Sequence, residues 1–204
     1  MCTIIFDLET NGLNPYHDDI IEIGAKILQE DSSFQMLVQP KSGRPVSKKI
    51  TEITGIANKD LRKDGKSWEN AYSEFYNWFF ENTKDKENIT LVSHNGDTFD
   101  FVFFRRMLKD LSEINGQLNI NLEKINFIDT LPLSKRLYPN RTYYNQPSLA
   151  RTFSIIVDNA HRAMGDVIVL EQLYSRIMGD FKINTQIDGL KDPLKVREFI
   201  DLKI

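Results

Sequence analysis

The chain has 204 residues, of which 41% are hydrophobic, and its 26 Lys and Arg against 29 Asp and Glu give a formal net charge of −3. This length suits one large α/β domain better than two independent ones, and the hydrophobic content excludes wholesale disorder. The acidic balance argues against a protein that holds a long stretch of nucleic acid through bulk positive charge, although a local or metal-bridged contact with phosphate stays open. The single cysteine, Cys2, excludes an internal disulfide framework and a thiolate zinc site.

No segment has the character of a targeting or membrane sequence. Acidic residues occur within the first seven positions, which is too early for the apolar region of a signal peptide. The longest apolar runs, such as residues 101–104, fall far below the roughly 18 residues of a membrane span. We therefore expect an intracellular, soluble protein, cytoplasmic or nuclear, without membrane contact.

The first forty residues predict three strands. Residues 3–8, 20–28 and 34–38 are apolar or alternating, and the polar residues 31–33 supply a turn between the last two. This pattern is typical of an antiparallel meander. Residues 41–45 are predicted to form a loop.

Helices and two further strands fill the rest of the chain. Short buried strands are predicted at 89–93 and 125–129, with a helix after each, the second of which ends before Pro139. A last strong helix carries apolar residues from Ala163 to Ile177. Before the first of these strands, four aromatic residues share one helical face and are interpreted as core residues rather than a base-stacking platform: Trp68, Tyr72, Phe75 and Phe79. The order predicts an α/β fold with a mixed five-stranded sheet flanked by helices.

The segment FDLETNG, residues 6–12, places two carboxylates at the end of the first strand. Asp7 and Glu9 are two residues apart, so their side chains leave the same face of the strand. Paired carboxylates repel each other and lose hydration unless a cation neutralises them, and Mg²⁺ or Mn²⁺ prefers such oxygen ligands. A D-x-E pair is also common on exposed strand ends, so this segment alone does not establish a metal site.

The segment SHNGDTFDFVFF, residues 93–104, follows a buried strand and opens a helix. Asp100 falls in the first turn of that helix, where the helix dipole favours a carboxylate; a plain helix-start residue is the alternative. We interpret Asp97 as a loop residue. His94 and Asn95 are expected to hold the loop by hydrogen bonding in preference to ligating a metal, and both are candidate substrate-binding residues.

A third acid lies in HRAMGD, residues 161–166. Asp166 shares its helix with Ala163 and Val167, so it points near the core, where an unpaired carboxylate is costly. His161, one of three histidines in the chain, lies five residues upstream. A lone histidine is usually structural, but this one precedes an acid that needs a cation.

These four acids and His161, in this order and these contexts, resemble the DEDDh group of 3′→5′ exonucleases, which have a ribonuclease H-like fold. The spacing from His161 to Asp166 matches the histidine subclass, whereas Arg162 stands where the tyrosine subclass has its aromatic base. HNGDTFD, residues 94–100, and ITGI, residues 53–56, look most like the three-prime repair (TREX-type) exonucleases. The resemblance covers about residues 3–178 of a single domain spanning 1–204, and residues 179–204 form a C-terminal extension that matches no motif.

The resemblance implies a site with two Mg²⁺ or Mn²⁺ ions. Asp7 would contact both ions, Glu9 and Asp166 would complete the site next to the attacking water, and Asp100 would orient the second. His161 would be the general base, since imidazole titrates near neutral pH.

The resemblance also implies recognition of a free 3′ end. Backbone groups of Thr10, Asn11 and Gly12 would hold the terminal sugar, with Leu13 against the end base. Ile53 or Ile56 would wedge beside the next base, although ordinary core packing is an equal alternative for these isoleucines. A homodimer is also implied.

The expected activity is metal-dependent hydrolysis of DNA from its 3′ end with release of nucleoside monophosphates. One alternative is a 3′→5′ exoribonuclease on single-stranded RNA, because composition does not reveal whether a 2′-hydroxyl is accepted. Another is an inactive exonuclease-like module that binds nucleic acid or a protein, and the intact set of acids with His161 argues against it.

Overall fold

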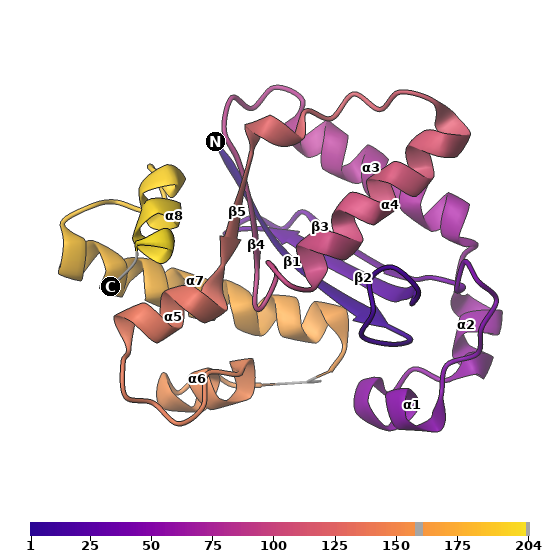
Figure 1. Cartoon of the computed structure of the whole chain (residues 1–204), viewed down its shortest axis with the longest axis horizontal. Coiled ribbons are helices and arrows are strands. Elements are labelled where there is room, and N and C mark those ends of the chain that lie inside the picture. The colour runs from indigo at the N-terminus through magenta and orange to yellow at the C-terminus, as the bar shows by residue number, and fades with distance from the viewer. Residues whose placement is uncertain (158–160, 203–204) are drawn as a thin grey trace.

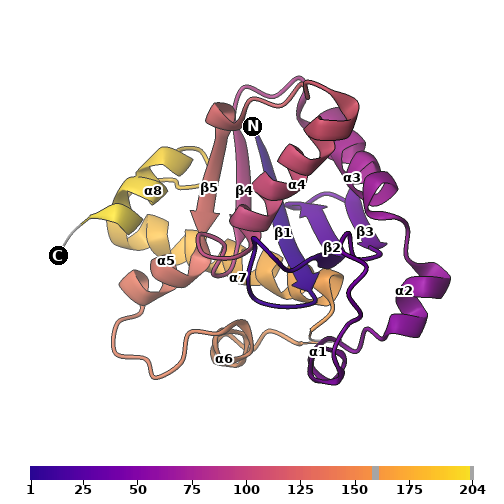
Figure 2. The same ribbon diagram turned by 45° about the vertical axis from the view of Figure 1, so that its right-hand side comes forward.

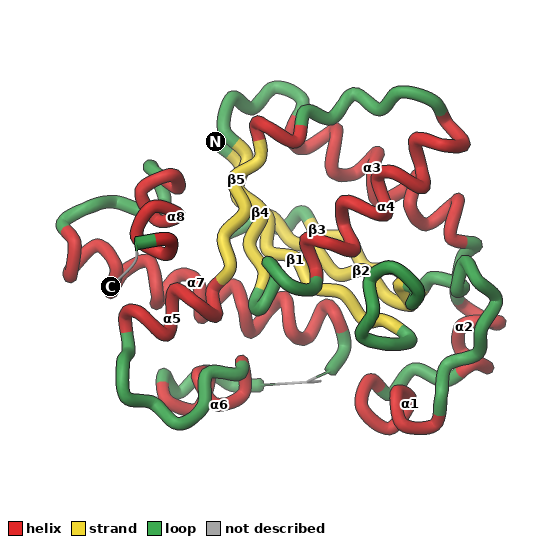
Figure 3. Tube along the Cα trace, viewed as in Figure 1, coloured by secondary structure: helices red, strands yellow, loops and turns green. Residues whose placement is uncertain are grey.

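A five-stranded mixed sheet forms the centre of the protein in a computed structural model that describes residues 1–157 and 161–202. The strands gather in the middle of the molecule (Figures 1 and 3) and lie in the order β3-β2-β1-β4-β5, as Figure 2 shows. β1 pairs antiparallel with β2, and β2 with β3, whereas β4 runs parallel to both β1 and β5. The expected meander and mixed five-stranded α/β fold are thus confirmed. The strands are β1 (Cys2–Thr10), β2 (Ile20–Ile27), β3 (Ser33–Leu37), β4 (Ile89–Ser93) and β5 (Ile125–Asp129).

Helices cover both faces of the sheet, with α3 and α4 over one face and α7 across the other (Figure 2). A short 3₁₀ turn at Leu122–Lys124 precedes β5. The α-helices are α1 (Lys48–Thr54), α2 (Asn58–Asp64), α3 (Trp68–Thr83), α4 (Asp100–Asn115), α5 (Thr130–Leu137), α6 (Gln146–Thr152), α7 (Ala163–Thr185) and α8 (Pro193–Asp201).

The alternation of β1 divides its side chains between two hydrophobic cores. Phe6 and Leu8 join the core beneath α3 and α4, together with the buried aromatic residues that the helical spacing of α3 predicted. Ile5 joins the core beneath α7. Because side chains alternate along a strand, Asp7 and Glu9 lie on the same side as Ile5. The core pattern therefore directs both carboxylates toward α7.

The C-terminal residues are part of the α7-side core. The expected core boundary at residue 178 falls inside α7, which continues to Thr185. α8 then buries Val196 and Ile200 in the same cluster, and the rings of Phe181 and Phe199 meet with centroids 5.3 Å apart. Within the described ranges, no helix is both long and apolar enough to cross a membrane.

Residues 46–64, which we call the α1–α2 arm, pack on the outer part of β2. Val46, Ile56 and Leu61 form a small buried cluster with Ile21 of β2. Ser47 caps α1 through its hydroxyl, and Gly55 ends α1 in the left-handed conformation at φ 71°. The arm is thereby anchored one residue away from Glu22.

Candidate active site

Three carboxylates meet at the carboxyl end of β1. Asp7 and Glu9 come from the strand, and Asp166 comes from the first turn of α7. One oxygen of each lies within 4.8 Å of the others. No described residue donates a hydrogen bond to the Asp7 or Glu9 carboxylate. The structure therefore brings together three of the four acids that the sequence singled out, in a donor set of the kind that a hard divalent cation prefers.

The electrostatics of this cluster disfavour three charged carboxylates. Burial raises the pKa of Asp7 well above its usual value, and the charges of Asp100, Asp166 and Glu9 raise it further. Burial, followed by repulsion from Asp166, raises the pKa of Glu9 to about 8. Burial also raises the pKa of Asp166, which the neighbouring His161 opposes. A bound cation would relieve this repulsion and restore the charged forms.

Asp100 is the first residue of α4 and is buried beside β1. Its Oδ1 accepts a hydrogen bond from the backbone N–H of Leu8 at 3.1 Å, and its Oδ2 accepts one from the Ser93 hydroxyl at 2.6 Å. Burial raises its pKa to about 7 even though these bonds favour the charged form. Asp100 is not one of the three clustered acids, and it holds the stretch of β1 between Asp7 and Glu9.

His161 lies on the surface just before α7, with φ 62° in the left-handed region. Its backbone N–H donates to Oδ2 of Asp166 at 3.2 Å. Its imidazole is close enough to oppose the burial-induced rise in the pKa of Asp166. The residue therefore lies at the rim of the carboxylate cluster and is exposed to water.

An ion pair between a fully buried carboxylate and a half-exposed guanidinium, which local sequence pattern did not predict, fixes the start of α7. The fully buried carboxylate of Glu22, in β2, accepts two hydrogen bonds from the Arg162 guanidinium at 2.7 and 3.0 Å. It also accepts one from the backbone N–H of Ala163 at 3.0 Å, so it caps α7 in place of a local side chain. The signal in the sequence was a charged residue in the middle of the apolar strand IIEIGA, because a buried charge needs a partner.

A second missed acid, Asp129, orders the loop that leads to Asp100. Its carboxylate accepts backbone hydrogen bonds from Asn95 and Asp97 and from Leu131 in α5, at 2.8–3.1 Å. Nδ1 of His94 lies 2.9 Å from the Thr130 hydroxyl, and burial lowers the pKa of His94 to about 4. His94 and Asn95 thus hold the loop as expected. Their contact with substrate stays a prediction.

The segment after Glu9 is closed by the residues that return the chain to β2. The backbone N–H and side-chain oxygen of Asn11 both bond to the backbone of Asp19, and the Thr10 hydroxyl donates to the carbonyl of Gly12 at 2.5 Å. A Cβ at Gly12 would overlap the Asp18 carboxylate, so any other residue there would displace that side chain. Leu13 is 81% exposed at the tip, where an apolar contact with a base is sterically open.

The two candidate wedge residues differ in exposure. Ile53 is 46% exposed on α1 and is available to a ligand. Ile56 is 2% exposed and packs against Ile21, Val46 and Leu61. The expectation that Ile56 wedges beside a base is therefore wrong for this structure. Ile56 is a core residue, because its side chain is buried beneath the arm.

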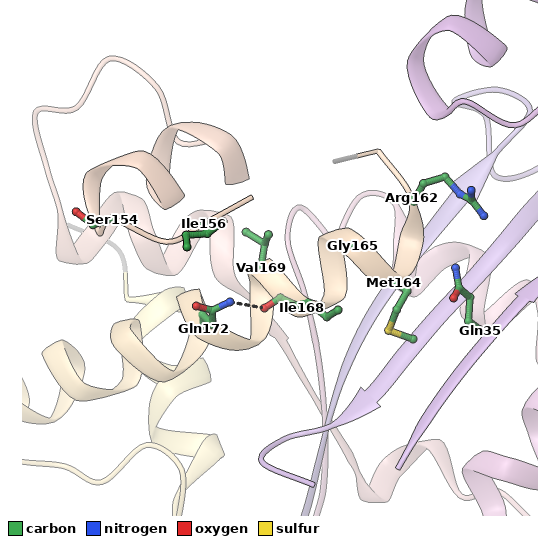
Figure 4. Close-up of a pocket in the computed structure, with 9 residues that line it drawn as sticks. All are labelled: Gln35, Ser154, Ile156, Arg162, Met164, Gly165, Ile168, Val169 and Gln172. Carbon is green, nitrogen blue, oxygen red and sulfur yellow. Dashed lines mark hydrogen bonds between the residues drawn. The ribbon is translucent and has the colours of Figure 1, made fainter. Parts of the chain in front are cut away.

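A cavity of about 710 Å³ lies beside the outer face of α7 (Figure 4). Arg162 and Gln35 line one end of it, and both donate to Glu22. Asp7, Glu9 and Asp166 are not among its lining residues. The cavity thus reaches the ion pair that supports the carboxylate cluster but not the cluster itself.

A family model described as exonuclease (RNase_T) matches residues 4–174, which include all four acids and His161. The chain belongs to this exonuclease family. The expected exonuclease resemblance is thereby confirmed, and the closer likeness to TREX-type members stays a prediction.

Relatives and solved structures agree with the family and the fold. The chain is 30% identical to the PolC-type DNA polymerase III of Thermotoga petrophila over 94% of its own length, and it spans only 13% of that protein. The zinc-bound complex of Escherichia coli exonuclease I with single-stranded DNA has a TM-score of 0.70 at 16% identity, covering 97% of this chain and 42% of that one. Cell-death related nuclease 4 has a TM-score of 0.67 at 17% identity, covering 92% and 65%. These likenesses confirm the ribonuclease H-like exonuclease fold.

Proposed function

We propose that the chain is a metal-dependent 3′→5′ exonuclease that removes nucleoside monophosphates from the 3′ end of DNA. The observation that carries the proposal is the convergence of Asp7, Glu9 and Asp166 within 4.8 Å, with His161 at the rim. Family membership supports the reaction class. The solved complex of exonuclease I with single-stranded DNA supports DNA as the substrate.

The donor set fits divalent cations. Three carboxylates supply only oxygen ligands, and the Asp7 and Glu9 oxygens are left without hydrogen-bond donors among the described residues. Mg²⁺ or Mn²⁺ suits such a set, and we propose two ions held by Asp7, Glu9, Asp100 and Asp166. When bound, a pair of such ions supplies positive charge to the phosphoryl transition state and to the leaving oxygen.

The chain itself positions the substrate and moves a proton. The His161 imidazole is exposed beside Asp166, so it can accept a proton from the attacking water. Asp100 keeps β1 in register through the N–H of Leu8. The closed turn from Thr10 to Gly12 presents backbone groups to the terminal sugar, and Leu13 packs against the end base.

Incubation of 5′-labelled single-stranded DNA and RNA of equal sequence with Mg²⁺, Mn²⁺ or excess chelator tests the proposal. We expect a ladder that shortens from the 3′ end, requires the metal and forms faster on DNA. A circular single strand should resist, and a 3′-phosphate should slow the reaction. Hydrolysis in excess chelator contradicts the metal requirement, and cutting of the circle contradicts end recognition. A faster ladder on RNA assigns the ribonuclease alternative.

The remaining expectations from the sequence are also proposals. A homodimer predicts a sedimentation coefficient that rises with protein concentration until it reaches that of two chains. An intracellular location, cytoplasmic or nuclear, is testable with a tagged full-length protein in cells.

A further inference from the structure

Positive charge is concentrated in one short part of this acidic chain. Residues 41–66 contain eight Lys and Arg against three acids, whereas the remaining residues contain eighteen Lys and Arg against twenty-six acids. The segment includes the whole α1–α2 arm. A surface of this sign on a protein of opposite net charge points to an anionic ligand.

Five of these basic side chains project into solvent from the arm. Lys59, Arg62 and Lys63 are spaced at i, i+3 and i+4, so they share one face of α2. Lys59 and Arg62 form no ion pair with any described acid, and the Lys63 ammonium is 4.0 Å from the carboxylate of the adjacent Asp64. The other two, Lys48 and Lys49, are exposed on α1, where the Lys48 side chain is 92% exposed and 3.7 Å from Glu52. Such weakly paired ammonium and guanidinium groups are free to meet phosphates.

The arm borders the carboxylate cluster. Its buried base packs on Ile21, and the next residue, Glu22, lies opposite Glu9 in the β1–β2 pair. The hydrogen bonds to Glu22 raise the pKa of the Arg162 guanidinium, and the charges of Glu9 and of Asp60 in α2 raise it further, so both the cluster and α2 lie within electrostatic reach of this arginine. Figures 1 and 2 both show α1 beyond the carboxyl end of β1.

We propose that the basic face of the α1–α2 arm binds the phosphodiester backbone of the substrate strand upstream of the scissile nucleotide. This inference rests on the proposed function and adds the path of the strand to it. The occupant follows from charge complementarity and position, because a strand whose 3′ end reaches the carboxylates carries a phosphate at every nucleotide. The arm supplies the positive charge that the chain as a whole lacks.

The triple variant Lys59→Gln, Arg62→Gln, Lys63→Gln tests this path. Glutamine keeps good helix propensity and removes only the charge. The matched control is Lys182→Gln, Lys191→Gln, Lys195→Gln. It changes the net charge equally, and these lysines belong to the α7–α8 region at the opposite end of the molecule from α2 (Figure 1). Thermal melting followed by circular dichroism verifies that each variant is folded.

The readouts are the affinity for a labelled twelve-nucleotide single strand at several salt concentrations and the hydrolysis of that strand and of a dinucleotide. Loss of three phosphate contacts lowers the slope of log K against log salt by about 2 for a single strand. We expect the α2 variant alone to show this change, with a several-fold higher KM on the long strand and no comparable change on the dinucleotide.

An unchanged salt slope and KM in the α2 variant would overturn the inference and leave the nuclease activity standing. An equal loss in the control variant would also overturn it, since the effect would then reflect net charge. If the parent hydrolyses neither substrate with Mn²⁺ but the α2 variant alone shows the reduced salt slope, the proposed function fails while the arm is still assigned as a nucleic-acid surface.

Discussion

Glu22 lies directly opposite Glu9 in the antiparallel β1–β2 pair, and the two carboxylates differ in their hydrogen-bond partners. Glu22 is bound by the Arg162 guanidinium and by the start of α7, whereas no described residue donates a hydrogen bond to Glu9. Neighbouring carboxylates on one sheet face repel each other, so pairing one with a guanidinium lowers the cost of burying the other. The same arginine adjoins His161 in the chain. The Glu22–Arg162 pair therefore fixes the α7 end of the carboxylate cluster.

Arg162→Ala should destabilise the fold through this pair. Among the described residues, the variant leaves the fully buried Glu22 with only the Gln35 amide and the Ala163 N–H as donors. Because the arginine is 40% exposed in its side chain, we expect a loss of about 1–3 kcal/mol rather than the larger cost of a fully buried pair. Urea unfolding in chelator measures it. Lys195→Ala, which breaks an exposed pair with Glu198, is the control and should cost well under about 1 kcal/mol. Equal urea midpoints for the two variants would contradict a stabilising role for the pair.

The sequence predicted the elements where local pattern decides them. The strands at 89–93 and 125–129 are confirmed at both ends, because each is a short apolar run bounded by polar residues. β1 runs two residues further than expected, to Thr10, since pairing with β2 continues past the carboxylates. The acids at the ends of these elements were predictable for the same local reason.

Long-range partners were beyond the reach of local pattern. Arg162 and Glu22 are 140 residues apart, and Arg197 of α8 reaches Asp97 across 100 residues. The neighbouring sequence of each of these residues does not indicate its partner. Ile53 and Ile56 are one helical turn apart in spacing, so periodicity alone could not separate the exposed from the buried one. The place of the C-terminal extension in the core was unpredictable for the same reason, because its partners on α7 and β5 are distant in the chain.

Stability of the metal-free protein should fall as pH rises from 6.5 to 8. Burial raises the pKa of Glu9 from 4.5 to about 8 and that of Asp100 to about 7, so the folded state holds protons that the unfolded state has lost. Under that condition the free energy of unfolding decreases with pH. His94, whose lowered pKa has the opposite effect at lower pH, no longer contributes above its ordinary value of 6.5. Each kcal/mol corresponds to about 2–4 °C in Tm for a chain of this size.

Thermal melting in chelator at three pH values checks this dependence. Glu9→Gln should flatten the slope because it removes one titrating group, and Mn²⁺ should raise Tm more at pH 8 than at pH 6.5. A metal-free Tm that stays level or climbs through this window would contradict the raised pKa values of Glu9 and Asp100.

The paired variants Ile53→Ala and Ile56→Ala should separate substrate contact from core packing. Ile56→Ala removes a fully buried side chain and should cost about 2–5 kcal/mol of stability. Ile53→Ala, at a half-exposed position, should leave the urea midpoint nearly unchanged and raise the KM for a single strand. The comparison of urea midpoints with KM values decides the assignment. An unchanged KM for Ile53→Ala would remove this residue from the substrate path.

His161→Ala and Asp166→Ala should fail in different ways. Asp166→Ala removes a carboxylate of the cluster, so both Mn²⁺ binding and hydrolysis should be lost. His161→Ala removes only the proposed general base, so Mn²⁺ and strand binding should survive while the chemical step slows by about 10²–10⁴-fold. Single-turnover hydrolysis of an end-labelled strand at saturating Mn²⁺, with Mn²⁺ affinity measured separately, distinguishes the two. Glu113→Ala, an exposed acid near the far end of α4 from Asp100, is the control and should match the parent in both measurements. If His161→Ala cleaves at the parental rate, His161 is a structural residue. A group other than its imidazole then accepts the proton from the attacking water.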